Sequence, residues 1–512
     1  MNIARFFEHW SIVENPFQAE EARHDPVFQR LGPQKVRHPD FDKILGDPSR
    51  PASSIVFGEK GSGKTAIRLQ IEKCVREHNG RASGARVLLT PYDDLNAGLD
   101  RFVDAARKTD GEDELKTLQR FTLSDHMDGI LHAATVRVVD GLLGDARCDG
   151  EAPVGREEAK SLRGAALSVR RDMMALQAIY DRPNDAPERT QRLRRLIRAP
   201  RGRGRTMWDA IAAVGWLPAV GAFWLDHEGY IPGLGFDLGK WVVFVLAGAW
   251  ALAFLKWVLV DIVLQRWMLG RLARRVAGQL RVLGRAPESL AASLAQIPKE
   301  DRNAQGLPMT PDDDARYAMF ARLLRVLRAM DYSAAMVVID RLDEPMLISG
   351  DGERMKAVAW PLMNNKFLQI PGFGLKMLLP IELRHALFRE SSAFFQEARL
   401  DKQNLIEQLK WTGATLYDLC NARLNACRTG DEPLNLVDLF DESVSRQDVV
   451  DALDQMQQPR DAFKLLYRCV QEHCSNVTDE APVWQMPRLT LEHVRKEQAE
   501  RVQQLFRGVR PA

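Results

Sequence analysis

A glycine-rich stretch, GEKGSGKT at residues 58–65, contains the residue types that bind phosphate groups. It matches the pattern G-x-x-x-x-G-K-[ST] at every fixed position. The glycines let consecutive backbone N–H groups surround a phosphate, and the N-terminus of a following helix adds partial positive charge. In this pattern the lysine reaches the β- and γ-phosphates and the threonine hydroxyl ligates Mg²⁺. The sequence therefore predicts a triphosphate-binding loop made of Gly58, Glu59, Lys60, Gly61, Ser62, Gly63, Lys64 and Thr65.

A second group of candidate residues follows an apolar run much later in the chain. Residues 336–339 read MVVI and end at Asp340, and Asp343 and Glu344 follow within DRLDE. A carboxylate at the end of a buried strand can hold the Mg²⁺ shell beside the threonine of the loop, so Asp340 is the predicted second metal ligand. A carboxylate near the γ-phosphate can orient and polarise the attacking water. We expect Asp343 or Glu344 to be this base and prefer Glu344; alternatively, these acids cap the following turn.

The segments around these motifs must place them together, and their pattern alternates between strand and helix. Apolar runs at 53–57, 85–92, 334–340 and 372–380 predict strands, and helical spacing follows the glycine loop. This alternation predicts a parallel sheet covered by helices. Beyond residue 400 the chain is predicted to be helical to its end. We therefore expect an α/β fold: a P-loop NTPase parallel sheet with a helical insertion containing a transmembrane hairpin, and a C-terminal helical lid.

The hairpin is predicted from two apolar segments between the nucleotide motifs. Residues 210–225 carry no charge, and residues 241–264 are interrupted only by Lys256 and Asp261. At about 1.5 Å per residue, helices of these lengths span roughly 24 and 36 Å, against a hydrocarbon core of about 30 Å. Both segments could cross a bilayer, which predicts a hairpin over 207–265.

The flanking charges favour a hairpin whose two ends are both cytoplasmic. Eight arginines and no acid occupy 189–205, six arginines and no acid occupy 266–285, and the connecting loop at 226–240 is net acidic. Arginine and lysine accumulate on the cytoplasmic side of membrane segments. The alternative is a buried helical hairpin in a soluble protein, with the arginine blocks as solvated faces or a nucleic-acid patch.

Lys256 is the main objection to the membrane interpretation. A single charge inside a span costs a few kcal/mol unless it reaches the interface or finds a partner. Asp261 and Asp209 both lie toward the same end of the hairpin, so either could neutralise it. Four tryptophans fit interfacial belts, although Trp257 is the least well placed among them: Trp208, Trp241, Trp257 and Trp267.

The motif VVIDRLDE at 337–344 resembles the acidic motif of STAND-type signalling ATPases, including NACHT domains. The apolar hairpin between the two nucleotide motifs is similar to the KAP P-loop NTPases, where, the resemblance implies, paired membrane helices are inserted inside the nucleotide domain. Specific matching covers 55–95 and 330–385. The sequence departs from the pattern at Arg341, where related AAA+ ATPases often carry the catalytic Glu, and this leaves the identity of the base open.

Three weaker signals fit the same resemblance. Asn15-Pro16-Phe17 resembles a segment that packs near adenine in AAA+-like ATPases, and Pro459-Arg460-Asp461 resembles their lid position, where Arg contacts the γ-phosphate. Each could equally be an ordinary turn and helix cap. Arg384 is a candidate arginine finger that would act on a neighbouring subunit of a homo-oligomer.

Composition bounds these interpretations. A chain of 512 residues exceeds what one hydrophobic core usually organises, so two or three structural units are expected. Its 71 basic and 69 acidic residues indicate no particular partner, and six scattered cysteines without a C-x-x-C pair indicate reduced intracellular thiols.

The N-terminal segment lacks the apolar stretch of a signal peptide, so the nucleotide-binding parts are expected to face the cytoplasm. The chain has no guanine-reading [NT]-K-x-D motif, which favours ATP over GTP.

The sequence thus predicts a Mg²⁺-dependent ATP-binding and ATP-hydrolysing switch of KAP/STAND type, tethered to the cytoplasmic membrane, with both termini and the ATPase domain in the cytoplasm. The resemblance implies bacterial antiphage defence or signalling through an unidentified effector protein. Two alternatives are a DNA-associated AAA+-like ATPase that uses the arginine-rich segments, and a nucleotide-binding scaffold without turnover. The expected parts are 1–98 (N-terminal segment and first part of the ATPase domain), 99–206 (helical insertion), 207–265 (hairpin), 266–330 (helical return and linker), 331–400 (second part of the ATPase domain) and 401–512 (lid).

Overall fold

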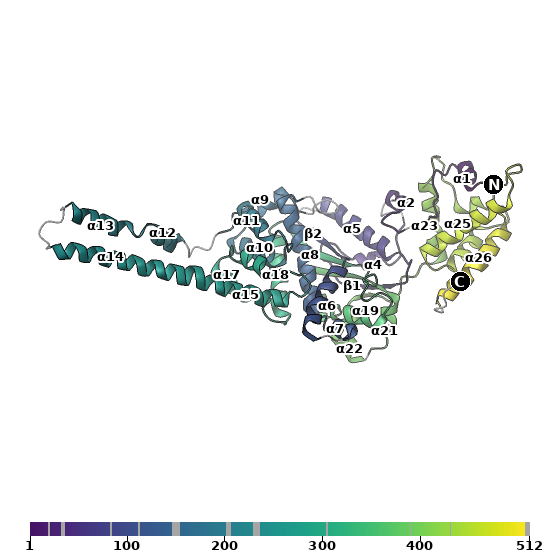
Figure 1. Ribbon diagram of the computed structural model, residues 1–512. Coiled ribbons are helices and arrows are strands. Elements are labelled where there is room, and N and C mark those ends of the chain that lie inside the picture. The colour runs from purple at the N-terminus through teal and green to yellow at the C-terminus, as the bar shows by residue number, and fades with distance from the viewer. Residues whose placement is uncertain are drawn as a thin grey trace. The chain divides into compact units, whose positions relative to one another are not determined.

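The chain forms two compact units in the computed structural model, labelled by element in Figure 1. Unit 1 consists of residues 1–96 and 332–512, and unit 2 of residues 97–331. Unit 2 is therefore an insertion in the sequence of unit 1, with bounds close to the predicted insertion at 99–330. The structure describes residues 1–18, 21–31, 36–81, 84–110, 113–145, 154–200, 206–228, 236–303, 306–390, 392–430 and 432–506.

Unit 1 contains a five-stranded, entirely parallel sheet with the order β2-β3-β4-β1-β5. The predicted α/β class with a parallel sheet is confirmed. The three central strands are almost entirely buried and, apart from Lys376 on β4 and a few serines, apolar, as expected for strands covered on both faces. The strands are β1 (Ser54–Gly58), β2 (Arg86–Tyr92), β3 (Tyr332–Ile339), β4 (Phe373–Pro380) and β5 (Asn404–Ile406).

Strand β5 shows that the prediction of a purely helical chain beyond residue 400 is wrong. This three-residue strand pairs in parallel with β1 at the edge of the sheet. Three residues are too few to display the alternation by which a strand is recognised in a sequence. The sheet consequently continues past the predicted start of the lid at 401.

Helix α5 joins the glycine loop to the sheet. It begins at Lys64 and buries Ile67, Ile71 and Val75, spaced four residues apart, in one cluster with Val56 and Val338 of the sheet. The other α-helices of unit 1 are α1 (Ile3–His9), α2 (Pro26–Arg30), α4 (Phe41–Leu45), α19 (Gly352–Ala359), α20 (Asn365–Leu368), α21 (Ile381–Leu387), α22 (Ser392–Ala398), α23 (Gly413–Ala426), α24 (Arg446–Asp454), α25 (Pro459–Asn476) and α26 (Arg488–Phe506).

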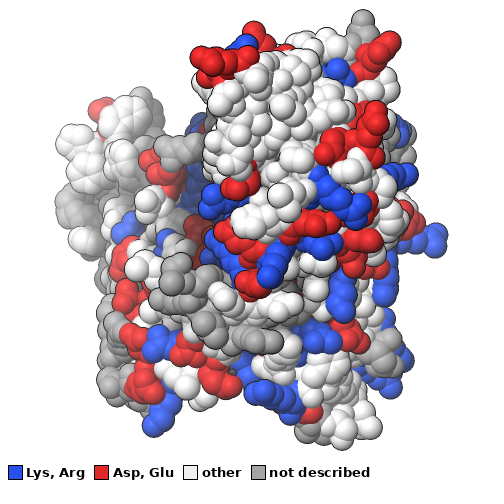
Figure 2. All heavy atoms as spheres, turned by 90° about the vertical axis from the view of Figure 1, so that its right-hand side faces the viewer, with Lys and Arg blue, Asp and Glu red and all other residues white. Residues whose placement is uncertain are grey.

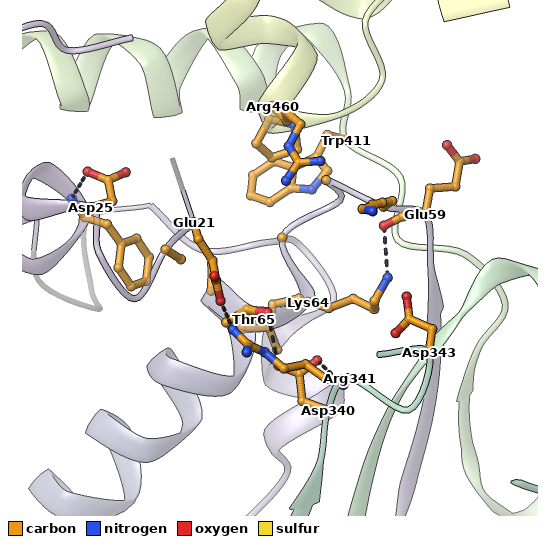
Figure 3. A pocket seen from close by; sticks show the side chains of 18 of the residues that line it. Glu21, Asp25, Glu59, Lys64, Thr65, Asp340, Arg341, Asp343, Trp411 and Arg460 are labelled. Atoms are coloured by element: carbon orange, nitrogen blue, oxygen red, sulfur yellow. Dashed lines mark hydrogen bonds and ion pairs between the residues drawn. The ribbon is translucent and has the colours of Figure 1, made fainter. Parts of the chain in front are cut away.

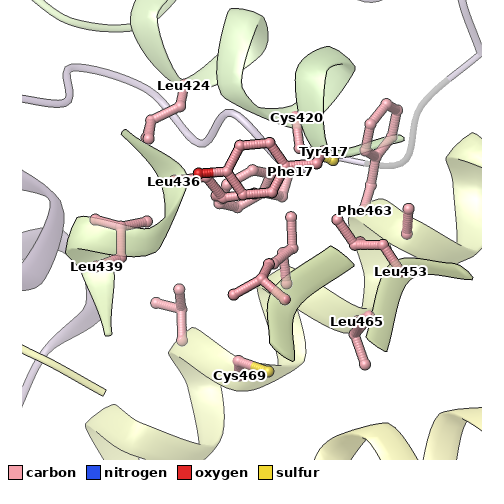
Figure 4. Packing of buried hydrophobic residues seen from close by; sticks show 14 of the residues in the cluster. Phe17, Tyr417, Cys420, Leu424, Leu436, Leu439, Leu453, Phe463, Leu465 and Cys469 are labelled. Carbon is pink, nitrogen blue, oxygen red and sulfur yellow. The ribbon is translucent and has the colours of Figure 1, made fainter. Parts of the chain in front are cut away.

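The C-terminal helices α23 to α26 form a helical bundle that also contains the N-terminal segment. Phe17 is 1% exposed and packs in the same hydrophobic cluster as Tyr417 and Phe463 (Figure 4). The Trp10 indole N–H donates to the carbonyl oxygen of Trp484 at 3.1 Å. The two ends of the chain therefore fold together in one bundle.

The described residues of unit 2 form helices joined by turns, and none of them is in a strand. Its interior contains buried ion pairs as well as apolar side chains: Arg316 contacts Asp128 at 3.0 Å, and Arg189 contacts Asp140 at 2.7 Å. Its helices are α6 (Asn96–Asp110), α7 (Glu114–Leu118), α8 (Leu123–Leu143), α9 (Arg156–Gly164), α10 (Leu167–Tyr180), α11 (Ala186–Ile197), α12 (Thr206–Val214), α13 (Leu217–His227), α14 (Phe236–Lys256), a π-helix (Trp257–Leu264), α15 (Gln265–Gln279), α16 (Pro287–Leu294), α17 (Lys299–Asn303) and α18 (Asp314–Arg328).

The second predicted span lies on a helix that continues from α14 through the π-helix into α15. Within it, Trp241–Leu259 is the one stretch of the described residues that is long and apolar enough to cross a membrane. None of this stretch is buried inside the structure. Large apolar side chains therefore meet solvent there, among them Trp241, Phe244 and Leu252.

The first predicted span is not one continuous helix. Helix α12 ends at Val214 and α13 begins at Leu217, directly before Pro218. Proline lacks a backbone N–H and disfavours helical backbone at the preceding residue, which accounts for the break. The two helices have 9 and 11 residues, so neither reaches the length of about 20 residues that a membrane span requires.

Asp209 has a partner other than the predicted lysine. Its carboxylate accepts a hydrogen bond from the Trp257 indole at 2.7 Å. Parts of the hairpin prediction lie outside the described residues: the loop at 229–235, residues 201–205 of the first arginine block, and the side chains of Trp208, Asp226, Asp237, Lys240 and Asp261.

Candidate functional site

A cavity of about 820 Å³ lies in unit 1 beside the glycine loop, beyond the carboxyl ends of β1 and β3 (Figure 3). Open parallel sheets usually bind ligands in this position. The cavity is lined by the predicted residues Glu59, Lys60, Gly61, Gly63, Lys64, Thr65, Asp340, Asp343, Glu344 and Arg460. Residues from the beginning, the middle and the end of the chain thus meet at one site.

The glycine loop has a backbone that only glycine adopts easily. Gly61 and Gly63 have φ angles of 100° and 94°, in the left-handed region. A Cβ atom on Gly58 would lie 2.5 Å from the Ser62 hydroxyl oxygen, so the loop folds too tightly for any side chain there. The buried Ser62 hydroxyl has no hydrogen-bond partner among the described residues. This tight cradle with an unsatisfied polar atom fits a bound phosphate group.

Lys64 is held by the loop itself. Its ammonium group donates to the carbonyl oxygens of Gly58 at 2.7 Å and Glu59 at 3.0 Å. Burial lowers the pKa of Lys64, and the carboxylates of Asp343 and Asp340 oppose this shift. The side chain is therefore a buried cation with nearby acids, which a phosphate group can replace as its partner.

Thr65 and Asp340 meet although 275 positions separate them. The Thr65 hydroxyl donates to the Asp340 carboxylate at 3.1 Å, and the other carboxylate oxygen accepts from the Arg341 N–H at 3.0 Å. Burial raises the pKa of Asp340, while Arg68 is the largest opposing influence. Mg²⁺ binds through one or two such oxygen ligands together with phosphate oxygens and water. The Thr65 hydroxyl and the Asp340 carboxylate fit this role as two oxygen ligands at the glycine loop.

The two candidate bases have different neighbours. Asp343 lies near Lys64 and is the strongest of the charges that act on it (Figure 3). Glu344 has a side chain that is 54% exposed, and it forms an ion pair with Arg341 at 3.4 Å. Arg341 has a φ angle of 62°, unusual for a residue other than glycine, and also pairs with Glu21. Both acids line the cavity, so the choice between them stays open.

The two candidate arginines lie in different places. Arg460, at the start of α25, packs over the loop, since a Cβ on Gly61 would lie 3.1 Å from the Arg460 Cβ. Arg384 is not a lining residue of the cavity and pairs instead with Glu407 at 3.0 Å. The structure therefore brings Arg460 to the site but not Arg384, whose finger role on a neighbouring subunit stays a prediction.

The segment Asn15-Pro16-Phe17 does not line the cavity. The Asn15 side chain accepts from the Phe17 N–H at 3.0 Å, and Phe17 is buried in the helical bundle. This segment, which resembles one that packs near adenine, thus does not contact the cavity. The segment forms a local turn that anchors the chain to the bundle.

The C-terminal part of the chain also contacts the loop through residues that were not predicted. The Trp411 indole donates to the Ser62 carbonyl oxygen at 2.9 Å, and the Gln408 amide donates to Glu59 at 2.9 Å. Gln458, directly before α25, donates to the same Glu59 carboxylate. A Trp or a Gln has no local pattern that marks it as a loop contact, so the sequence carries no signal for these residues.

The end of the cavity away from Lys64 was also not predicted. Asp25 lies at that end in Figure 3, and Arg423 pairs with it at 2.6 Å. The cavity also has apolar lining residues: Phe28, Leu31, Val36, Ile67, Leu419 and Phe463. No family model, curated protein or solved structure significantly matches this chain.

Proposed function

We propose that this protein is a P-loop NTPase that binds ATP with Mg²⁺ and hydrolyses it. The observation that carries the proposal is the contact between Thr65 and Asp340 beside the buried Lys64. A metal-binding hydroxyl, a carboxylate and a phosphate-binding lysine at one glycine loop are the parts that phosphoryl transfer requires. Neither the glycine loop nor the acidic end of β3 could support phosphoryl transfer alone, because each supplies only part of the metal and phosphate contacts.

In this proposal each residue acts from the position that it occupies beside the glycine loop. Lys64 exchanges the carbonyl oxygens of Gly58 and Glu59 for the β- and γ-phosphates. Thr65 and Asp340 would hold Mg²⁺, which would supply neutralisation of the charge on the phosphate oxygens. Asp343 or Glu344 orients the attacking water and accepts its proton.

The C-terminal helical bundle would act as a lid that senses the nucleotide. Arg460 lies over the glycine loop, and Trp411 and Gln458 already contact it. A γ-phosphate would give Arg460 a charged partner, and hydrolysis would remove that partner. The protein would then alternate between a closed and an open arrangement of lid and sheet, as nucleotide switches do.

We further propose that the protein is tethered to the cytoplasmic membrane through residues 207–265. The exposed apolar stretch Trp241–Leu259 supports this, because water would otherwise surround it. The four arginines Arg266, Arg271, Arg274 and Arg275 that follow are exposed as well, as the cytoplasmic end of a span requires. On the resemblance to KAP and STAND ATPases, the switch would serve bacterial antiphage defence or signalling.

Observations on the arginine blocks speak against the nucleic-acid alternative. Arg189 is buried and bonds to the carboxylates of Asp140, Asp145 and Asp181. Arg281 bonds to Asp125. Both arginines are therefore paired with carboxylates within unit 2. Figure 2 shows a different region, the side of unit 1 that carries the C-terminal helices, and acidic and basic side chains are interspersed there.

Nucleotide titration tests the proposal directly. Lys64→Ala should weaken ATP binding at least tenfold and abolish phosphate release, because the phosphates lose their buried cation. Lys73→Ala is the matched control, since Lys73 lies on the same helix but not in the cavity. Equal ATP affinity in Lys64→Ala and the wild type would refute the site. Stimulation of phosphate release by DNA would instead support the nucleic-acid alternative.

A further inference from the structure

We propose that Arg423 recognises the adenine base, by donating a hydrogen bond from its Nη2 atom to a ring nitrogen. This inference rests on the proposed function, because it assigns the second end of the same nucleotide cavity. Arg423 lies on α23, far in sequence from both nucleotide motifs.

The cavity has two chemically different ends. One end contains the charged groups that suit phosphates and a metal: Lys64, Thr65, Asp340 and Asp343. At the other end Asp25 and Arg423 lie beside the lining residues Phe28 and Phe463, and Leu31, Val36, Ile67 and Leu419 add further apolar side chains to the cavity wall. Apolar and aromatic walls with a few placed polar groups are typical of a pocket for a flat base.

The guanidinium of Arg423 is held rigidly. The residue is 2% exposed; its Nε donates to the Pro16 carbonyl oxygen at 2.7 Å, and its Nη1 donates to Asp25 at 2.6 Å. Its Cζ atom lies 4.5 Å from the centroid of the Phe463 ring. Nη2 is buried and has no hydrogen-bond partner among the described residues. A fixed, unsatisfied donor at a cavity wall is costly unless a ligand supplies an acceptor.

The local charges favour a neutral acceptor over another phosphate. Asp25 balances the charge of Arg423, and its second oxygen accepts from the backbone N–H groups of Val27 at 2.9 Å and Phe28 at 3.1 Å. An additional phosphate would need unbalanced positive charge, which this pair does not provide. A ring nitrogen needs only a donor.

Gln70 supports the choice of adenine. It lines the cavity, and its amide nitrogen donates to the Val36 carbonyl oxygen at 3.2 Å, so its amide oxygen can accept from an exocyclic amine. Adenine combines ring nitrogen acceptors with an exocyclic amino donor. Arg423 and Gln70 together thus offer the complementary donor and acceptor.

Ligands and variants can be combined to test this contact. The affinities of the full-length protein would be measured for ATP, for 1-deaza-, 3-deaza- and 7-deaza-ATP, and for inorganic tripolyphosphate. One deaza analogue should bind about tenfold or more weakly, because a hydrogen bond from a charged donor is lost. Arg423→Lys keeps the charge pair with Asp25 but lacks the Nη2 donor. It should weaken ATP binding by a similar factor, leave tripolyphosphate binding unchanged and abolish the penalty of that analogue.

Arg428→Lys is the matched control, because Arg428 also bonds to a carbonyl oxygen of the N-terminal segment but lies outside the cavity. It should behave as the wild type does. Wild-type protein that binds all three deaza analogues as tightly as ATP would overturn the assignment without any variant. An unchanged deaza penalty in Arg423→Lys would also overturn it. Failure of the proposed function would look different, since tripolyphosphate would then not bind to the wild type at all.

Discussion

Arg341 directly follows Asp340 at the carboxyl end of β3. It takes a left-handed backbone conformation and forms ion pairs with Glu21 and Glu344. Such conformations are costly for a side-chain-bearing residue and are often retained at functional sites. Glu344 lines the cavity and pairs with Arg341, so under the proposed function an acid would lie near the γ-phosphate.

The assignment of the base gives a prediction at this scale. Glu344→Gln should lower the rate of ATP hydrolysis by about 10²- to 10⁴-fold while ATP affinity is retained, because a general base contributes about this factor. Single-turnover phosphate release and nucleotide titration would measure the two quantities. Asp343→Asn is the comparison variant and should reduce the rate less. A larger loss in Asp343→Asn than in Glu344→Gln would assign the base to Asp343.

At the scale of elements, β4 contains a buried lysine in the middle of the sheet. Lys376 is fully buried between β3 and β1, and its ammonium group donates to the Ala52 carbonyl oxygen at 2.7 Å. Burial lowers its pKa to about 7. The unfolded chain keeps the proton up to a pKa near 10.5, so between about pH 7 and 10.5 the unfolded state binds more protons than the folded state. The contribution of Lys376 to the free energy of unfolding therefore rises with pH between these two pKa values.

Lys376→Met should remove this dependence. The free energy of unfolding should increase by up to about 5 kcal/mol at pH 7 and below, since each pKa unit corresponds to about 1.4 kcal/mol, and the gain should shrink toward pH 10. Denaturant unfolding at several pH values would measure it. Lys43→Met, at an exposed position on α4, should change little. A gain that does not vary with pH would contradict the role of the buried charge.

The packing of the N-terminal segment into the C-terminal bundle gives a further prediction. Phe17→Ala should destabilise unit 1 by about 3–5 kcal/mol, because it deletes a fully buried aromatic side chain. Thermal unfolding and limited proteolysis of the bundle would show the loss. Val13→Ala alters a residue of the same segment that is 66% exposed and should stay within about 0.5 kcal/mol of the wild type. Equal effects of the two variants would show that the segment does not stabilise the bundle.

At the scale of the whole molecule, the cavity and the apolar helices belong to different units. Every lining residue of the cavity lies in unit 1, whereas the stretch Trp241–Leu259 lies in unit 2. If the proposed function and the proposed tether are right, nucleotide binding and membrane association should be separable, because they would depend on different units.

Replacement of residues 206–264 by a flexible Gly/Ser linker tests this separation. The full chain should be extracted from cells only with detergent, whereas the variant should be released without it and bind ATP with the same affinity. Fractionation and nucleotide titration would measure the two properties. Extraction of the full chain by high salt alone would contradict the membrane tether. A large loss of ATP affinity in the variant would contradict the independence of the site.

Local patterns in the sequence determined several parts of this protein. The glycine loop, the acidic end of β3, four of the strands and the apolar stretch on α14 are each encoded within a few neighbouring residues. The parallel sheet follows from the alternation of these elements. Such a local pattern can be recognised without knowledge of the fold, because it consists of the periodicity and spacing of neighbouring residues.

Only the tertiary structure decided the features that depend on distant partners. Strand β5 exists through its pairing with β1, and Phe17 is a core residue through contact with the C-terminal helices. The Arg423 guanidinium is aligned by Asp25, which lies 398 positions away. Hydrogen bonds and packing of this kind have no repeating spacing along the chain, so their energies act only once the folded backbone has brought the partners together.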